Sequence, residues 1–92
     1  MNLTSEQIIK VENDGFKINT VIENNYPIIK SIEKNCLHIW LIIGDYRNDF
    51  KQEYQSAFLI NGYYRMHKKY ASLTCAMNRN KLNRTYHSYS DS

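Results

Sequence analysis

The fold is decided by one apolar stretch, Cys36-Leu37-His38-Ile39-Trp40-Leu41-Ile42-Ile43. It is too short to cross a membrane as a helix, which takes roughly 18 apolar residues, and its length suits a buried strand. The stretch is apolar at both odd and even positions, which is typical of a central strand covered on both faces. We therefore expect Trp40 and Ile42 to be buried in a sheet.

Turn-forming residues divide the chain before this strand into short segments. Residues 23–27 and residues 33–35 are rich in asparagine and charged side chains, and the apolar segment 28–32 lies between them. Pro27 is compatible with the start of a strand and with the first turn of a helix. The spacing of the turns predicts a β-meander.

The first segment of the chain has two interpretations. Asn13-Asp14-Gly15 is typical of a hairpin turn, and residues 9–12 and 16–21 on either side alternate between apolar and polar. Thr4-Ser5-Glu6-Gln7 has instead the form of a capping box, which would begin a short helix. We favour the hairpin, because both flanking segments show the alternation.

The residues after the central strand favour helices. Asp45 is a good N-cap, and apolar side chains from Tyr46 to Phe58 recur on one side of a helix that begins there. Beyond Gly62, apolar residues at steps of three and four predict a second amphipathic helix over residues 63–77. In this helix the cations lie on an arc away from the apolar stripe, namely Arg65, Lys68, Lys69 and Arg79.

A hairpin is the alternative for residues 54–66. Asn61-Gly62 is a strong hairpin signal, and it would pair residues 57–60 with residues 63–66. We prefer the helices. The sequence thus predicts an α+β fold, a small antiparallel β-meander with C-terminal helices packed on it.

The length of 92 residues leaves room for one domain. We expect residues 1–78 to form a compact domain and residues 79–92 to be a basic tail that is mobile until it binds a partner. A core of this size has little surplus stability, so a bound partner or a homodimer would stabilise it. The first four residues lack the basic and apolar regions of a secretory signal, so we expect a cytoplasmic protein.

Charge is distributed unevenly along the chain. Residues 54–90 contain no acidic side chain, whereas acids outnumber bases eight to six in residues 1–53. A face that served only for solubility would mix both signs. Cations neutralise phosphates and tyrosine rings stack on unpaired bases, so this half is expected to bind an anionic partner such as nucleic acid. Tyr63 and Tyr70 fall on the apolar stripe and are expected in the core. The candidate contact residues are Arg65, Lys68, Lys69, Arg79, Lys81, Arg84, Tyr64 and Tyr86.

No residue pattern predicts catalysis or a cofactor. A closed zinc site takes four ligands, and Cys36-x-His38 supplies two. Cys36 and Cys75 are expected to be reduced, because disulfides are rare in the cytoplasm. The three glycines stand alone, which excludes a glycine-rich loop that cradles phosphate. We expect no metal, no cofactor and no enzymatic activity.

The chain is small, its excess of lysine, asparagine and isoleucine points to an A/T-rich coding sequence, and its basic residues gather in one half. In this profile it resembles the small proteins that bacteriophages make against their hosts, and among them anti-CRISPR proteins. The resemblance implies a non-enzymatic inhibitor in the host cytoplasm. It would bind a CRISPR effector, contacting Cas protein and guide RNA through its basic half, and block recognition of target DNA. The alternative is a small phage transcription regulator that binds DNA or RNA directly, with residues 63–77 as a recognition helix.

Overall fold

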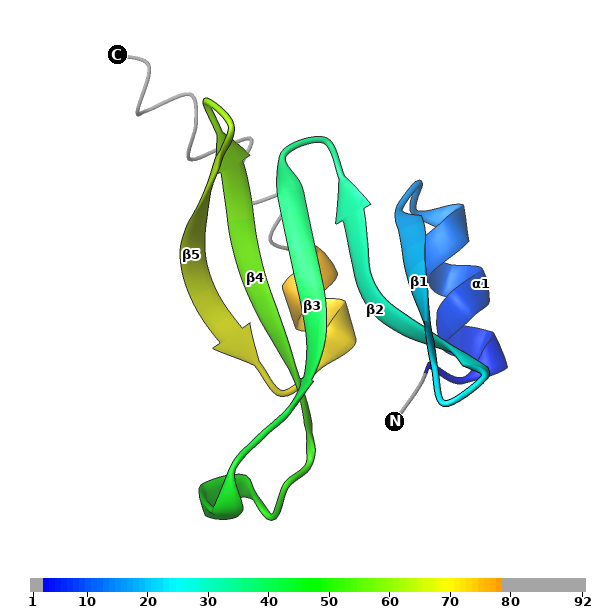
Figure 1. Ribbon diagram of the computed structural model, residues 1–92. Helices are drawn as coiled ribbons and strands as arrows, with labels where there is room; N and C mark the ends of the chain where they lie inside the picture. The colour runs from blue at the N-terminus through cyan, green and yellow to red at the C-terminus, as the bar shows by residue number, and fades with distance from the viewer. Residues whose placement is uncertain (1–2, 79–92) are drawn as a thin grey trace.

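A computed structural model describes residues 3–78, which form a five-stranded antiparallel sheet with helices. The strands lie side by side in chain order, so the predicted β-meander and the broad α+β class are confirmed (Figure 1). β3 is the central strand, as predicted. The elements are α1 (Ser5–Asn13), β1 (Lys17–Glu23), β2 (Tyr26–Lys34), β3 (Leu37–Ile43), the 3-10 turn η1 (Tyr46–Asn48), β4 (Gln52–Ile60), β5 (Tyr63–Tyr70) and a helical segment at 73–78.

α1 begins at a capping box. The Thr4 hydroxyl accepts a hydrogen bond from the backbone N–H of Gln7 at 3.2 Å, and the side-chain oxygen of Gln7 accepts one from the backbone N–H of Thr4 at 2.8 Å. The predicted hairpin at Asn13-Asp14-Gly15 is wrong, because these bonds start a helix that runs through residues 9–12 and buries Val11 completely. The strand expected after this turn is confirmed as β1.

β4 and β5 form a hairpin, so the two helices predicted across this region are wrong. Asn61 and Gly62 have φ values of 51° and 83°, the left-handed geometry of a two-residue hairpin turn. β4 is a strand in spite of the helical spacing of its apolar residues, because pairing with β3 buries Tyr54 and Phe58 in the core. Within the described residues, η1 and the segment at 73–78 are what remains of the predicted C-terminal helices.

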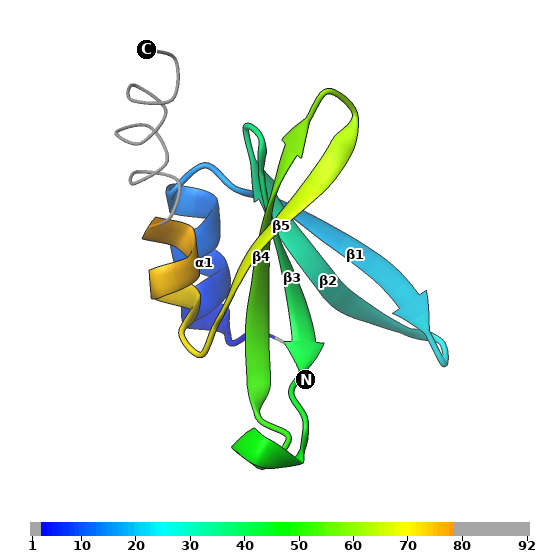
Figure 2. The same cartoon turned by 90° about the vertical axis from the view of Figure 1, so that its left-hand side faces the viewer.

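The helices lie on a single face of the sheet, which we call the covered face (Figure 2). α1 and the segment at 73–78 are neighbours there, and the Lys10 ammonium donates a hydrogen bond to the Thr74 hydroxyl at 3.3 Å. The core lies between these helices and the sheet. Its buried side chains are Leu3, Val11, Phe16, Ile32, Leu37, Ile39, Tyr54, Phe58, Leu73, Ala76 and Met77.

The opposite face, which we call the open face, carries no helix in the part of the chain that the structure describes (Figure 2). Trp40 and Ile42 lie on this face and are half-buried, so the prediction that both are buried is wrong. β3 is apolar on both faces: Leu37 and Ile39 are buried on the covered face, whereas on the open face His38 is buried and its neighbours Trp40 and Ile42 are only half-buried. No helix in residues 3–78 has the length and apolar character needed to cross a bilayer.

Candidate partner-binding surface

β5 carries every described residue of the predicted contact set. Tyr64, Arg65, Lys68 and Lys69 lie on this strand, which forms one edge of the sheet and is exposed from Tyr63 onwards through Lys69. No other strand of residues 3–78 pairs with its outer side, so this edge is open to a partner. The remaining predicted contact residues lie outside the described residues, namely Arg79, Lys81, Arg84 and Tyr86.

Neighbouring residues of β5 face opposite sides of the sheet. Lys68 lies opposite Ser56 on the covered face, where its ammonium is 5.3 Å from the centroid of the Tyr70 ring. Lys69 lies opposite Gln55 on the open face. The prediction that the cations cluster on one side of a helix is therefore wrong. The strand presents them on both sides of an exposed edge.

The three cations of β5 have no carboxylate partner among the described residues. We call Arg65, Lys68 and Lys69 the cationic edge. The ion pairs that the described chain contains lie within the β1–β2 pair and in the β3–β4 loop, and Glu33 of β2 is occupied by its contact with His38 of β3. A phosphate or carboxylate of a partner would therefore meet positive charge that no ion pair within residues 3–78 neutralises.

Three aromatic rings meet on the open face beside the cationic edge. The centroid of the Tyr64 ring lies 4.9 Å from that of His38 and 5.0 Å from that of Trp40, at interplanar angles of 75° and 76°. The His38 and Trp40 rings are 5.9 Å apart and inclined at 29°. Edge-to-face and offset contacts of this kind are favourable between aromatic rings. We call these three residues the aromatic cluster, and Tyr64, 47% exposed, is its outermost member.

A series of hydrogen bonds connects β1 to the aromatic cluster. The Asn19 amide donates to the Ser31 hydroxyl at 3.0 Å and to one Glu33 carboxylate oxygen at 3.2 Å. The other Glu33 oxygen lies 2.8 Å from His38 Nε2. With Nε2 donating to Glu33, Nδ1 is the acceptor of the neutral ring, and this atom is buried without a hydrogen-bond partner among the described residues. An unsatisfied buried acceptor costs about 1–3 kcal/mol, so Nδ1 is a candidate ligand contact.

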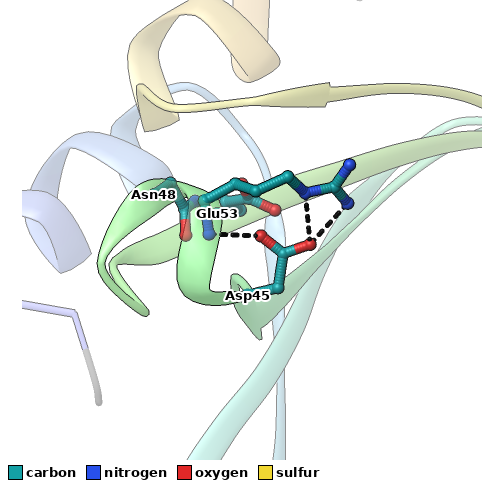
Figure 3. A network of polar contacts seen from close by, with 4 residues as sticks. Asp45, Asn48 and Glu53 are labelled. Atoms are coloured by element: carbon teal, nitrogen blue, oxygen red, sulfur yellow. Dashed lines mark hydrogen bonds and ion pairs between the residues drawn. The ribbon is translucent and has the colours of Figure 1, made fainter.

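The β3–β4 loop closes one end of the sheet with a polar network (Figure 3). The Asp45 carboxylate accepts hydrogen bonds from Arg47 Nε at 3.0 Å and from the Arg47 amide at 2.9 Å. These bonds, with a smaller contribution from the charge of Lys69, hold the pKa of Asp45 below its ordinary value of 3.8, and the carboxylate raises the pKa of Arg47. The Asn48 amide donates to the Glu53 carboxylate. Asp45 and Glu53 thus have partners within this region.

The sequence predicts Tyr63 and Tyr70 in the core and does not identify the aromatic cluster. Tyr70 packs against the core, but Tyr63 is 80% exposed, so that half of the prediction is wrong. The sequence predicts Trp40 inside the sheet, because both faces of its strand are apolar. The signal for the cluster is the Asn61-Gly62 turn, because the hairpin that it forms brings Tyr64 beside Trp40.

Residues 3–78 contain no group of three or more His, Cys, Asp or Glu side chains placed to hold a metal ion. Cys36 is half-buried and Cys75 is exposed, and no disulfide joins them. No family model, curated protein or solved structure matches the chain. We therefore infer function from the chemistry of the cationic edge and the aromatic cluster.

Proposed function

We propose that this protein is a non-enzymatic inhibitor of the anti-CRISPR type, which binds a host CRISPR ribonucleoprotein through its basic half and blocks recognition of target DNA. The observation that carries the proposal is the cationic edge. It places three positive side chains on an exposed edge strand, and no carboxylate within residues 3–78 forms an ion pair with any of them. The protein acts in the host cytoplasm, where the effector assembles.

Two properties of β5 support binding to such a complex. Its side chains alternate, so Lys68 and Lys69 project to opposite sides of the sheet and can contact phosphates or acidic side chains on either side. Its outer side pairs with no described strand, so an extended segment of Cas protein can also lie along it. A ribonucleoprotein offers both RNA phosphate and protein to the same strand.

The test is an interference assay in bacteria that each carry one type of CRISPR effector directed against the same phage. The protein should restore plaque formation in the strain whose effector it binds. Lys68→Glu with Lys69→Glu should abolish that effect, because like charges would now face the phosphates. Lys17→Glu with Lys51→Glu is the matched control, since it changes the net charge equally at two exposed positions away from β5.

Retained inhibition by the β5 variant would overturn the role of the cationic edge. Full immunity in every strain that expresses the wild-type protein would overturn the proposed function for the effectors tested. Thermal unfolding of each variant, compared with wild type, separates lost binding from lost fold.

A direct nucleic-acid-binding regulator is the second candidate. Its helix-turn-helix form is wrong, because most of residues 63–77 form β5 in place of a recognition helix. The aromatic cluster favours a different form, in which a sheet face binds single strands. Affinity capture with and without nuclease distinguishes the candidates. A nuclease-resistant complex with Cas proteins supports the inhibitor, and nucleic acid that is lost on digestion supports the regulator.

A further inference from the structure

We infer that the aromatic cluster is a stacking site for an unpaired base of single-stranded nucleic acid, with Lys69 holding a neighbouring phosphate. The inference deepens the proposed function, because the RNA of a ribonucleoprotein would be the natural source of such a base. It concerns the open face, whereas the proposed function rests on the charge of β5.

The first step is the accessibility of the rings. The strand register places His38, Trp40 and Tyr64 on the open face. No described helix covers this face (Figure 2). Tyr64 belongs to an edge strand and is about half exposed, and Trp40 is half-buried beside it. Aromatic side chains on a sheet surface are a general platform for unpaired bases, because every base has a π-face and stacking tolerates any sequence.

The second step is the unsatisfied acceptor beneath Tyr64. His38 is 6% exposed, and its Nδ1 has no hydrogen-bond partner among the described residues. A purely apolar partner placed on this cluster would leave that atom unpaired. The amino and imino groups of a base are donors of the kind that this acceptor lacks. The cluster therefore fits a flat ligand that carries N–H donors at its edge.

The third step is charge complementarity. Lys69 shares the open face with the cluster, because Lys69 pairs with Gln55 of β4 and Gln55 pairs with Trp40 of β3. Tyr64 and Lys69 pair with Leu59 and Gln55, which are four residues apart on β4, so about 13 Å separates them along the strand, a distance that a short oligonucleotide can span. Asp45, whose carboxylate senses the charge of Lys69, is already bonded to Arg47, and Glu33 is bonded to His38 and Asn19. A phosphate approaching Lys69 therefore meets positive charge that no ion pair of the described residues offsets.

The experiment uses the full 92-residue chain and a fluorescein-labelled octanucleotide, which lies within the usual site size of about 4–16 nucleotides. Anisotropy of the label gives the Kd. Quenching of Trp40, the single tryptophan of the chain, reports whether the base reaches the cluster. Oligo(U), oligo(A) and oligo(dT) are titrated separately, so that RNA and DNA as sources are distinguished.

The variants exploit two pairs of adjacent, chemically identical residues on opposite faces. Tyr64→Ala should raise the Kd about 5- to 150-fold, the range expected for loss of one stacked base. Tyr63→Ala removes the same side chain from the other face and should change the Kd less than about twofold. Lys69→Ala should weaken binding more than Lys68→Ala and lower the salt slope by about one.

Each outcome bears on the inference. Saturable quenching with the Tyr64 and Lys69 effects supports it, even if no CRISPR effector is inhibited, and in that case the proposed function alone fails. Equal effects of Tyr63→Ala and Tyr64→Ala, or binding without quenching of Trp40, overturn it. Capture of an effector by a protein that binds none of the oligonucleotides also overturns it and leaves the proposed function intact.

Discussion

The two faces of the sheet are built from similar residues but have different surroundings. On the covered face, Ile32, Leu37 and Ile39 are completely buried beneath α1 and the helix at 73–78. On the open face, Trp40 and Tyr64 remain partly exposed. β3 supplies apolar side chains to both faces, so its composition does not decide which of them is enclosed. Exposed apolar patches often mark interaction sites, so the aromatic side chains that stay partly exposed on the open face indicate a candidate binding surface.

The largest expected difference between the faces comes from truncating one isoleucine of β3 on each. Ile39→Ala removes a fully buried side chain and should lower the free energy of unfolding by about 2–5 kcal/mol. Ile42→Ala, on the open face, should lower it by about 1 kcal/mol, because this side chain is half-buried. Urea denaturation measures both.

If Ile39→Ala does not fold, Ile39→Val replaces it, with an expected loss of about 0.5–1.5 kcal/mol. Equal losses for Ile39→Ala and Ile42→Ala would mean that the open face is as enclosed in solution as the covered face. That result would contradict the distinction between the two.

A smaller effect, but one whose sign is decisive, concerns the turn that brings Tyr64 onto the open face. Gly62 has φ of 83°, so Gly62→Ala should lower the free energy of unfolding by about 1–2 kcal/mol. At a position inside a helix, by contrast, replacing glycine by alanine stabilises by about 1 kcal/mol. Gly62→Asn is the control, because asparagine tolerates this conformation better than alanine. Stabilisation by alanine would refute the β4–β5 hairpin.

The smallest effect concerns the β3–β4 loop, away from the buried side of the sheet. The pKa of Asp45 is lowered in the folded protein, so its stabilising contribution is present above its ordinary value near 3.8 and is lost as the pH falls through the lowered folded value. Asp45→Asn should therefore have a lower Tm than wild type at neutral pH, and the two Tm values should converge in acid. Arg47→Gln, which removes the donor side chain, should show the same convergence. A difference that grows on acidification would contradict this assignment.

Much of the sheet could be predicted because its signals are local. The turns before and after β2 and the apolar run of β3 give the first part of the meander its order. α1 could not be chosen with certainty, because residues 9–12 satisfy an alternating and a helical pattern equally. The reciprocal hydrogen bonds of Thr4 and Gln7, with burial of Val11, decide in favour of the helix.

The candidate site was harder to predict than the fold. Arg65, Lys68 and Lys69 follow from composition, because charge is visible in the sequence. The face of the sheet on which each of these cations lies does not follow from composition, because a helix and a strand place the same residues differently. The aromatic cluster depends on contacts between β3 and β5, and a long-range contact of this kind has no local signature before the pairing of β4 is known.

The bulge in β5 has a consequence for how this strand can change. Ser56 pairs with Lys68 and Ala57 pairs with Met66, so His67 is an extra residue between them. The part of β5 before His67 and the part after it therefore follow separate registers. Deleting His67 would merge the two registers into one and leave Lys68 opposite Ser56, Lys69 opposite Gln55 and Tyr64 opposite Leu59. The bulge is what allows Tyr64 and Lys69, which are five residues apart, to share a face, because residues an odd number apart in a regular strand face opposite sides.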